Sequence, residues 1–212
     1  LNSVLQQLYH TRAFSGPLMG AAPARRPGRE QDELLFKLQV LFASLHVGQR
    51  RYHDTRPLCS SFLDYDGRPM SLAEQKDAYE FCSMLLDKLE RSSDAARELV
   101  KATFGGTLQY QIVPREPGCA HTSTRDEPFL MLTAEVQTKD TLAAALDLFT
   151  SGETLDGDNK YLCEQCGRRV AAQRRCAIKD LPPTLIVHLK RFEFNLETMT
   201  RHKLNHRCAF PM

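Results

Sequence analysis

The second half of the chain is constrained most strongly by a pair of cysteines and, further on, by a proline break within a run of β-forming residues. Cys163 and Cys166 are three residues apart and are followed by Gly167, a spacing typical of a turn that brings two thiolates together. A Leu181-Pro-Pro sequence then precedes the segment Leu185–Phe194, in which side chains alternate between two faces. Because proline cannot donate to a strand ladder, we expect separate strands on its two sides. The pattern therefore predicts a β-rich region with a thiol-bearing hairpin.

The beginning of the chain predicts helices joined by a loop. Residues Asn2–Tyr9 predict a short helix, and apolar residues recur at helical spacing from 34 to 45. The segment Ser15–Glu30 is rich in glycine and proline and lacks an apolar period. We therefore expect a surface loop between these two helices.

A further helix precedes a series of strands. Ser71–Glu74 has the pattern of a capping box, which predicts a helix from Leu72 to about Arg91. Strands are predicted at 107–113, 129–136, 160–163, 169–178 and 184–194, with a helix at 141–149. Because helices come first and strands follow, the predicted fold class is α+β.

Composition excludes few functions. The 212 residues carry 28 Lys plus Arg and 26 Asp plus Glu, a net charge of +2 that indicates neither a nucleic-acid nor a membrane partner. Seven cysteines form an odd number without the spacing of a secreted disulfide framework, and neither a signal peptide nor a membrane-spanning apolar run is present. These features favour a reducing, intracellular compartment.

Three segments occur in the order found in the ubiquitin-specific proteases. They are Leu1–Leu8, Gln75–Phe81, and the strand Leu185–Phe194 behind the thiol knuckle and the proline break. The chain resembles this family over nearly its whole length. The resemblance implies a papain-like hand, with a helical thumb in residues 1–101 and a β-rich palm and fingers hairpin in residues 102–212, together one incomplete catalytic domain.

The resemblance also implies an activity and a partner. Members are cysteine-type deubiquitinases, thiol hydrolases that cleave the (iso)peptide bond after the C-terminal glycine of ubiquitin. The implied partners are ubiquitin and ubiquitinated proteins, and the implied location is the cytoplasm, the nucleus or both. The alternative within the same family is a catalytically inactive member that binds ubiquitin without cutting it.

The family's catalytic residues are expected outside these 212 residues. The nucleophilic cysteine would lie two residues before Leu1, at the start of the first helix, and the histidine box would lie beyond Met212. The chain by itself is therefore expected to be inactive. Cysteines outside the knuckle region are predicted to be buried apolar residues: Cys59, Cys82, Cys176 and Cys208.

Residues that bind the ubiquitin tail are implied by the middle and last segments. Gln75, Asp77 and Glu80 match the family's acidic helix box, with Lys76 in place of its second glutamine, and carboxylates there would pair with arginines of the ubiquitin tail. Phe192 would flank the tail channel. The alternatives are that the acidic residues only complement the helix dipole and that Phe192 packs in the core.

A metal site is implied by four positions near the hairpin. The firm ligands are Cys119, Cys163 and Cys166, and the fourth is His121, Glu116 or water. Glu116 stands where the family has another cysteine. On an extended strand Cys119 and His121 would point to opposite sides, although a turn would relieve this conflict. The sequence thus leaves open a structural Zn²⁺ site or a hairpin that has lost its metal.

A different class of function would use the knuckle as a zinc ribbon for nucleic acid or a scaffold. Its phosphate contacts would be Arg168, Arg169, Arg174 and Arg175. This alternative leaves the first eight residues and the Gln75–Phe81 helix unexplained, so the protease resemblance is preferred.

Overall fold

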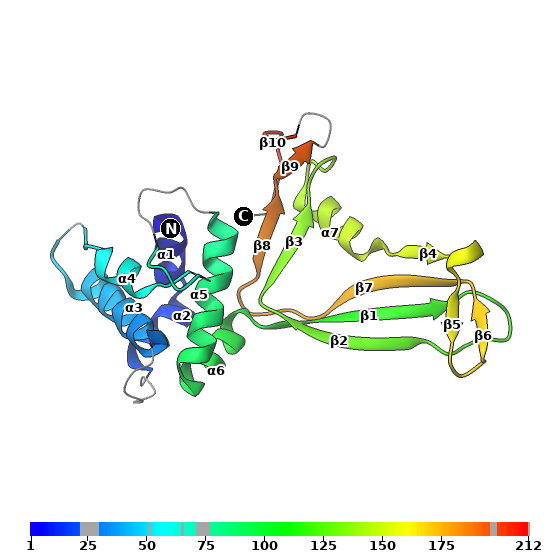
Figure 1. Cartoon of the computed structure of the whole chain (residues 1–212), viewed down its shortest axis with the longest axis horizontal. Helices are drawn as coiled ribbons and strands as arrows, with labels where there is room; N and C mark the ends of the chain where they lie inside the picture. Colours follow the sequence, from blue (N-terminus) through cyan, green and yellow to red (C-terminus); the bar gives the residue numbers. More distant parts are fainter. Residues whose placement is uncertain (22–29, 51, 65, 71–76, 196–198, 212) are drawn as a thin grey trace. The chain divides into compact units, whose positions relative to one another are not determined.

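The computed structural model describes residues 1–21, 30–50, 52–64, 66–70, 77–195 and 199–211. The chain divides into two compact units, Leu1–Thr103 and Phe104–Met212. Helices dominate the first unit and strands dominate the second (Figure 1). The predicted α+β class is confirmed.

The first unit consists of helices. They are α1 (Asn2–His10), α2 (Arg12–Gly20), α3 (Glu30–Val47), α4 (Arg56–Ser61), α5 (Ala78–Ser92) and α6 (Asp94–Phe104). Helix α3 contacts α2, α4 and α5. The largest buried side chains of this unit include Phe14, Leu18, Leu35, Leu38, Phe42, Phe62, Leu85 and Leu89. The helices predicted at the start of the chain and at residues 34–45 are confirmed as α1 and α3.

The predicted loop over Ser15–Glu30 is wrong in its first part, because α2 includes its first residues. Phe14 and Leu18 lie one turn apart on α2 and are fully buried. Gln39 of α3 donates a hydrogen bond of 2.9 Å to the carbonyl of Leu18, which satisfies a group at the end of the helix. Burial and this bond offset the cost of Pro17 inside the helix. Residues 22–29 lie outside the described residues.

Helix α5 begins later than predicted. It starts at Ala78 rather than Leu72, because Asp77 has an extended backbone, with a ψ of 130°, and serves as the N-cap. The predicted capping box at Ser71–Glu74 lies outside the described residues. Helices α4 and α6 were not predicted.

The second unit contains an antiparallel sheet and shorter strand pairs. Its elements are β1 (Gly106–Pro114), β2 (Ser123–Phe129), β3 (Met131–Glu135), α7 (Leu142–Ser151), β4 (Glu153–Leu155), η1 (Gly157–Asn159), β5 (Tyr161–Cys163), β6 (Arg168–Val170), β7 (Ala172–Asp180), β8 (Ile186–Lys190), β9 (Phe192–Asn195) and β10 (Thr200–Lys203). The main sheet has the order β2-β1-β7-β4. Strands β1 and β7 are paired along most of their length, and the β5–β6 hairpin lies at one end of this sheet (Figure 1).

Two predicted strands are each split into two. The strand predicted at 169–178 is interrupted at Ala171, whose N–H donates to the Glu116 carboxylate at 2.9 Å. The strand predicted at 184–194 is interrupted at Arg191, because β8 pairs with β3 in parallel whereas β9 pairs with β10. Strand β2 was not predicted. It is an edge strand whose side chains are almost all exposed.

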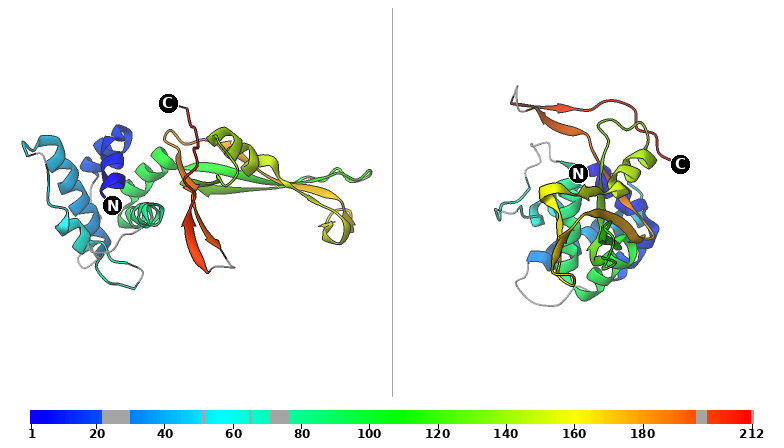
Figure 2. Two further views of the ribbon diagram at one scale, coloured as in Figure 1. Left: turned by 90° about the horizontal axis from the view of Figure 1, so that it is seen from above. Right: turned by 90° about the vertical axis from the view of Figure 1, so that its right-hand side faces the viewer.

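A second apolar cluster anchors β3, β8 and α7. Its buried members are Ala134, Val136, Ala145 and Cys208, and Val187 and Leu189 pack against them. Helix α7 contacts both β3 and β7, and lies beside the main sheet (Figure 2). The predicted helix at 141–149 is confirmed, and it ends as predicted at Gly152, which has a φ of 75°. None of the described helices has the length and apolarity needed to cross a membrane.

Candidate functional site

The thiol knuckle is a tight hairpin built on β5 and β6. The two strands are antiparallel, with Cys163 opposite Arg168. The N–H of Gly167 donates to the carbonyl of Cys163 at 2.9 Å, and Gly167 has a φ of 65°, a conformation that glycine adopts readily. This turn brings Cys166 back toward Cys163, as the spacing predicts.

The loop that follows β1 supplies two further side chains. The N–H of Thr122 donates to the carbonyl of Ala120 at 3.1 Å, which makes a tight turn centred on His121. Cys119 and His121 are therefore not on an extended strand, and their side chains converge. The turn relieves the conflict that the sequence left open.

Four ligand-type side chains meet where these two loops approach each other. The sulfurs of Cys119, Cys163 and Cys166 and a ring nitrogen of His121 all lie within 4.8 Å of one another. The Nδ1 atom of His121 is 4.0 Å from the Cys119 sulfur, 3.8 Å from the Cys163 sulfur and 3.2 Å from the Cys166 sulfur. Ligand bonds of about 2.3 Å to sulfur and about 2.05 Å to nitrogen put tetrahedral S···N edges at about 3.6 Å. The three distances lie around this value, so the cluster has the dimensions of a tetrahedral metal site.

The thiols of this cluster are electrostatically unequal. The backbone N–H of Cys166 donates to the Cys163 sulfur and lowers the pKa of that thiol to about 6, and the His121 side chain acts in the same direction. The pKa of Cys166 is raised to about 11, mainly because of its hydrogen bond with the Cys119 sulfur and then because of burial. Cys163 therefore ionises more readily than Cys166. A divalent cation would bind these cysteines as thiolates and release their protons.

Glu116, an alternative fourth ligand, is engaged elsewhere. Its carboxylate lies 2.5 Å from Lys160 Nζ and also accepts the Ala171 N–H at 2.9 Å. The Lys160 ammonium, and next the Ala171 amide, hold the pKa of this carboxyl below its usual value. Glu116 thus joins the loop after β1 to the β6–β7 junction. Glu116 and Lys160 are 44 residues apart in the sequence, so short-range sequence patterns do not indicate this ion pair.

The structure describes three of the four residues predicted to bind the ubiquitin tail, namely Asp77, Glu80 and Phe192. Gln75 lies outside the described residues. Asp77 is exposed, and its Oδ1 accepts the N–H of Tyr79 at 2.7 Å and of Glu80 at 3.3 Å. Phe192, in the second unit, is 57% exposed and has Lys203 Nζ 5.9 Å from its ring centroid. Phe192 is thus not a core residue.

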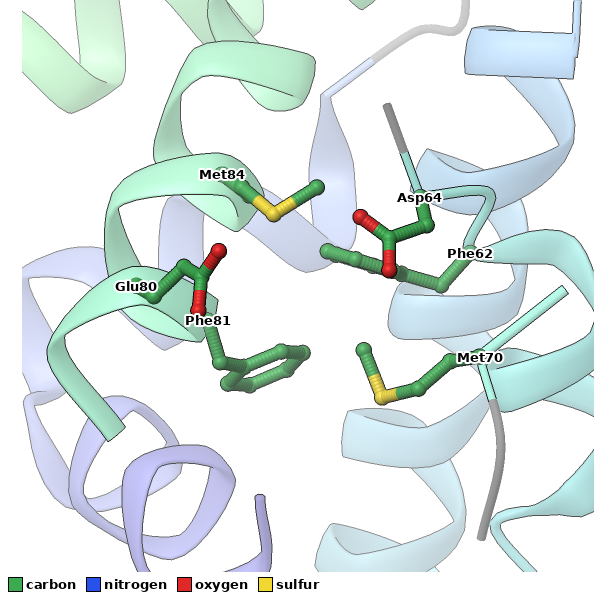
Figure 3. Close-up of a pocket in the computed structure, with 6 residues that line it drawn as sticks. All are labelled: Phe62, Asp64, Met70, Glu80, Phe81 and Met84. Atoms are coloured by element: carbon green, nitrogen blue, oxygen red, sulfur yellow. The ribbon is translucent and has the colours of Figure 1, made fainter. Parts of the chain in front are cut away.

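Glu80 lies at a hollow within the first unit. It projects from the first turn of α5 next to Phe81 and Met84, and it faces side chains of a second segment around Asp64 (Figure 3). This hollow gives Glu80 neighbours that the sequence did not associate with it.

The cysteines outside the cluster are unsuited to act as nucleophiles. Cys82 is buried on α5, and burial raises the pKa of its thiol to about 11. Burial also raises the pKa values of Cys59 and Cys176. Cys208 is buried in the second apolar cluster. Because thiolates are the reactive form, these groups match the predicted role of small apolar residues, although Cys176 is only partly buried.

Comparison with known proteins identifies the family. The family model described as ubiquitin carboxyl-terminal hydrolase matches residues 1–212. Similar proteins include ubiquitin carboxyl-terminal hydrolase puf of Drosophila melanogaster, 35% identical over 99% of this chain, and ubiquitin carboxyl-terminal hydrolase 34 of Homo sapiens, 34% identical over 100% of it. Human ubiquitin carboxyl-terminal hydrolase 24 is 30% identical over 100% of the chain.

The chain spans only a small part of these relatives, namely 5%, 6% and 8% of their respective lengths. The match nevertheless includes every residue of this chain, from the helical unit to the strands that carry the metal-type cluster. Its mixed helices and strands agree with the papain-like fold of a ubiquitin-specific protease domain. The chain therefore belongs to the ubiquitin carboxyl-terminal hydrolase family.

Proposed function

We propose that this chain is part of the catalytic domain of a cysteine-type deubiquitinase. The enzyme would hydrolyse the (iso)peptide bond after the C-terminal glycine of ubiquitin, so its partners are ubiquitin and ubiquitinated proteins. The observation that carries the proposal is the family match over all 212 residues, with relatives named as ubiquitin carboxyl-terminal hydrolases. The seven free cysteines suit a cytoplasmic or nuclear location.

The proposed chemistry is acyl transfer by a cysteine that the family places two residues before Leu1, directly ahead of α1. Amide N–H groups at a helix start stabilise a thiolate, and a histidine from the box that follows Lys203–Pro211 in the family would take its proton. Cys82 is unsuited to this role, because burial raises the pKa of its thiol to about 11. The 212 residues alone are therefore proposed to bind ubiquitin without hydrolysing its conjugates.

Recognition of the ubiquitin tail is assigned to Gln75, Asp77, Glu80 and Phe192. The exposed carboxylates of Asp77 and Glu80 at the start of α5 support this assignment, because arginines precede the terminal glycines of ubiquitin. The exposed ring of Phe192 offers an apolar contact for the same segment.

The cluster of Cys119, His121, Cys163 and Cys166 is proposed to hold a structural Zn²⁺. Three thiolates and one imidazole at tetrahedral spacing form a known zinc ligand set. Four protein ligands leave no open position, so the ion would cross-link the two loops rather than activate water. The loop after β1 and the β5–β6 hairpin would then be held together by the metal and by Glu116.

The decisive experiment treats the full-length protein with ubiquitin that carries a C-terminal electrophile. We expect a covalent adduct that is lost when the proposed nucleophile is replaced by alanine. Saturable ubiquitin binding without an adduct would instead support the catalytically inactive alternative. Neither binding nor adduct would refute both.

A further inference from the structure

A groove of the second unit lies where α7 packs beside β7 (Figure 1). It has a volume of about 340 Å³ and is open to solvent. This volume falls at the lower end of the range for small-molecule sites, about 300–1,000 Å³. The lining residues come from β1, α7, β4 and β7, and include Tyr110, Leu148, Phe149, Glu153, Arg174 and Cys176.

Part of the lining is apolar. Tyr110 of β1 and Cys176 of β7 are partners in the antiparallel pair, so their side chains stand next to each other on one face of the sheet. Burial raises the pKa of the Cys176 thiol, which therefore carries no charge at neutral pH. Tyr110 and Leu148 are 39% and 46% exposed, so a flat apolar guest in the groove would cover surface that now faces water.

Arg174 supplies positive charge to this groove. It lies two residues before Cys176 on β7, so both side chains leave the same face of the strand. The Nε atom of Arg174 lies 3.0 Å from Oε1 of Glu153. A guanidinium has five donors in a planar fork, so a carboxylate at Nε leaves the edge formed by the two Nη groups for a second acceptor. The Arg174 side chain is 61% exposed, which makes this edge accessible.

The negative groups that line the groove already have partners. The Ser151 hydroxyl donates to the carbonyl of Leu148 at 2.9 Å, and Gln173 Nε2 donates to the carbonyl of Ser151 at 3.3 Å. These bonds satisfy acceptors at the C-terminal end of α7, where the helix dipole is negative. Glu153 is paired with Arg174. The groove therefore suits an anionic guest better than a cationic one.

Arg175 also lines the groove, but its guanidinium is engaged on the other face of the sheet. Its Nε donates to Gln111 Oε1 at 2.7 Å. Gln111 follows Tyr110 on β1, so these two β1 side chains point to opposite faces. Recognition of an anion in the groove is therefore assigned to Arg174.

We propose that this groove binds a small aromatic carboxylate, a ligand with a flat apolar body and one negative group. The body lies against Tyr110, Leu148 and Phe149, and the carboxylate accepts hydrogen bonds from the Nη edge of Arg174. Glu153 holds the guanidinium in position from its Nε side. The groove includes none of the residues assigned to the ubiquitin tail, so the inference does not depend on the function proposed above.

The test uses the full-length protein and two probes of the same shape, 2-naphthoate and the neutral 2-naphthamide. Saturation-transfer NMR measures the binding of each probe to the wild type, Arg174→Gln and Glu153→Gln. Arg169→Gln is the matched control, because Arg169 is an exposed arginine of β6 that does not line the groove. Thermal unfolding verifies that each variant is folded. It also gives a second reading, since a ligand that binds only the folded state raises the melting temperature.

We expect one saturable site for 2-naphthoate, with a Kd on the order of 0.1–1 mM for a ligand of this size. 2-Naphthamide should bind about five- to tenfold more weakly. Arg174→Gln should weaken the binding of 2-naphthoate by about the same factor and leave that of 2-naphthamide unchanged. Glu153→Gln should bind 2-naphthoate at least as tightly as the wild type, because it keeps the cation and removes a competing anion. The control should bind both probes as the wild type does.

Several results would overturn the inference. The first is a folded wild type without saturable binding of 2-naphthoate. The second is equal affinity for the two probes, since the negative charge would then play no part. The third is equal weakening by Arg174→Gln and Glu153→Gln, because loss of their ion pair would then explain the effect. The last is weakening by Arg169→Gln, which would place the probe outside the groove.

Discussion

Substitutions at Asp77 should separate its structural role at α5 from its proposed role in binding the ubiquitin tail. Its carboxylate accepts two amide N–H groups, from Tyr79 at 2.7 Å and from Glu80 at 3.3 Å. Alanine removes this cap, whereas asparagine keeps an oxygen acceptor of the same shape without the charge. Asparagine and aspartate are about equally good N-caps, so the two substitutions differ mainly in the cap.

The expected magnitudes follow from these contacts. Loss of an N-cap costs about 1 kcal/mol, within a range of roughly 0.5–2, and loss of a charge at a helix start costs about 0.3–1 kcal/mol. Asp77→Ala should therefore lower the free energy of unfolding by about 1–2 kcal/mol, and Asp77→Asn by less than about 1 kcal/mol. In a chain of this size, 1 kcal/mol corresponds to about 2–4 °C in melting temperature.

The two Asp77 variants should differ in stability but not in ubiquitin affinity. Both variants lack the negative charge, so both should weaken ubiquitin binding about tenfold, which corresponds to about 1.4 kcal/mol. Urea unfolding followed by circular dichroism measures stability, and calorimetric titration measures affinity. Asp94→Ala is the control, because Asp94 is an exposed acidic residue in the first turn of α6. Equal destabilisation by alanine and asparagine would refute the capping argument, and wild-type affinity of Asp77→Asn would refute the charge argument.

Further substitutions test the second unit. His121→Ala removes a proposed metal ligand, so it should lower zinc affinity by at least about 100-fold in a chelator competition. Glu116→Gln should retain the metal. The reverse result would show that Glu116 is the ligand. The contribution of Glu116 to stability should be complete above the pKa of the unfolded carboxyl and be lost as pH falls through its lowered folded pKa, so unfolding curves of wild type and Glu116→Gln should converge in acid. Equal stability of the wild type and Glu116→Gln at neutral pH would contradict this role of Glu116. Gly152→Ala should lower the free energy of unfolding by about 1–3 kcal/mol, because a β-carbon there would lie 2.5 Å from a backbone carbonyl at a φ of 75°. Gly157→Ala, at a φ of 53° in open space, should cost less, and equal costs would show that the contact is irrelevant.

Short-range patterns predicted most of the fold because they act within a few residues. The apolar period of α3, the glycine that ends α7 and the glycine that closes the thiol knuckle all depend on local spacing. The predictions were wrong where a contact with a distant segment determines the local structure. Helix α2 contains Pro17 but is completed by Gln39, and the break at Ala171 exists because its amide bonds to Glu116. Neither partner can be identified from a window of neighbouring residues.

The candidate sites show the same division between local and distant information. The sequence identified three cysteines and left the fourth ligand open, because the choice between His121 and Glu116 depends on a turn and on an ion pair. The turn centred on His121 directs its ring toward the sulfurs, while the Glu116 carboxylate bonds to Lys160 and to the Ala171 amide. Glu116, which stands where the family has a cysteine ligand, thus forms a second link between the loop after β1 and the β5–β6 hairpin. If that link and the metal act independently, removing both should destabilise the hairpin by the sum of the two separate effects; a smaller effect would mean that one link forms only when the other is present.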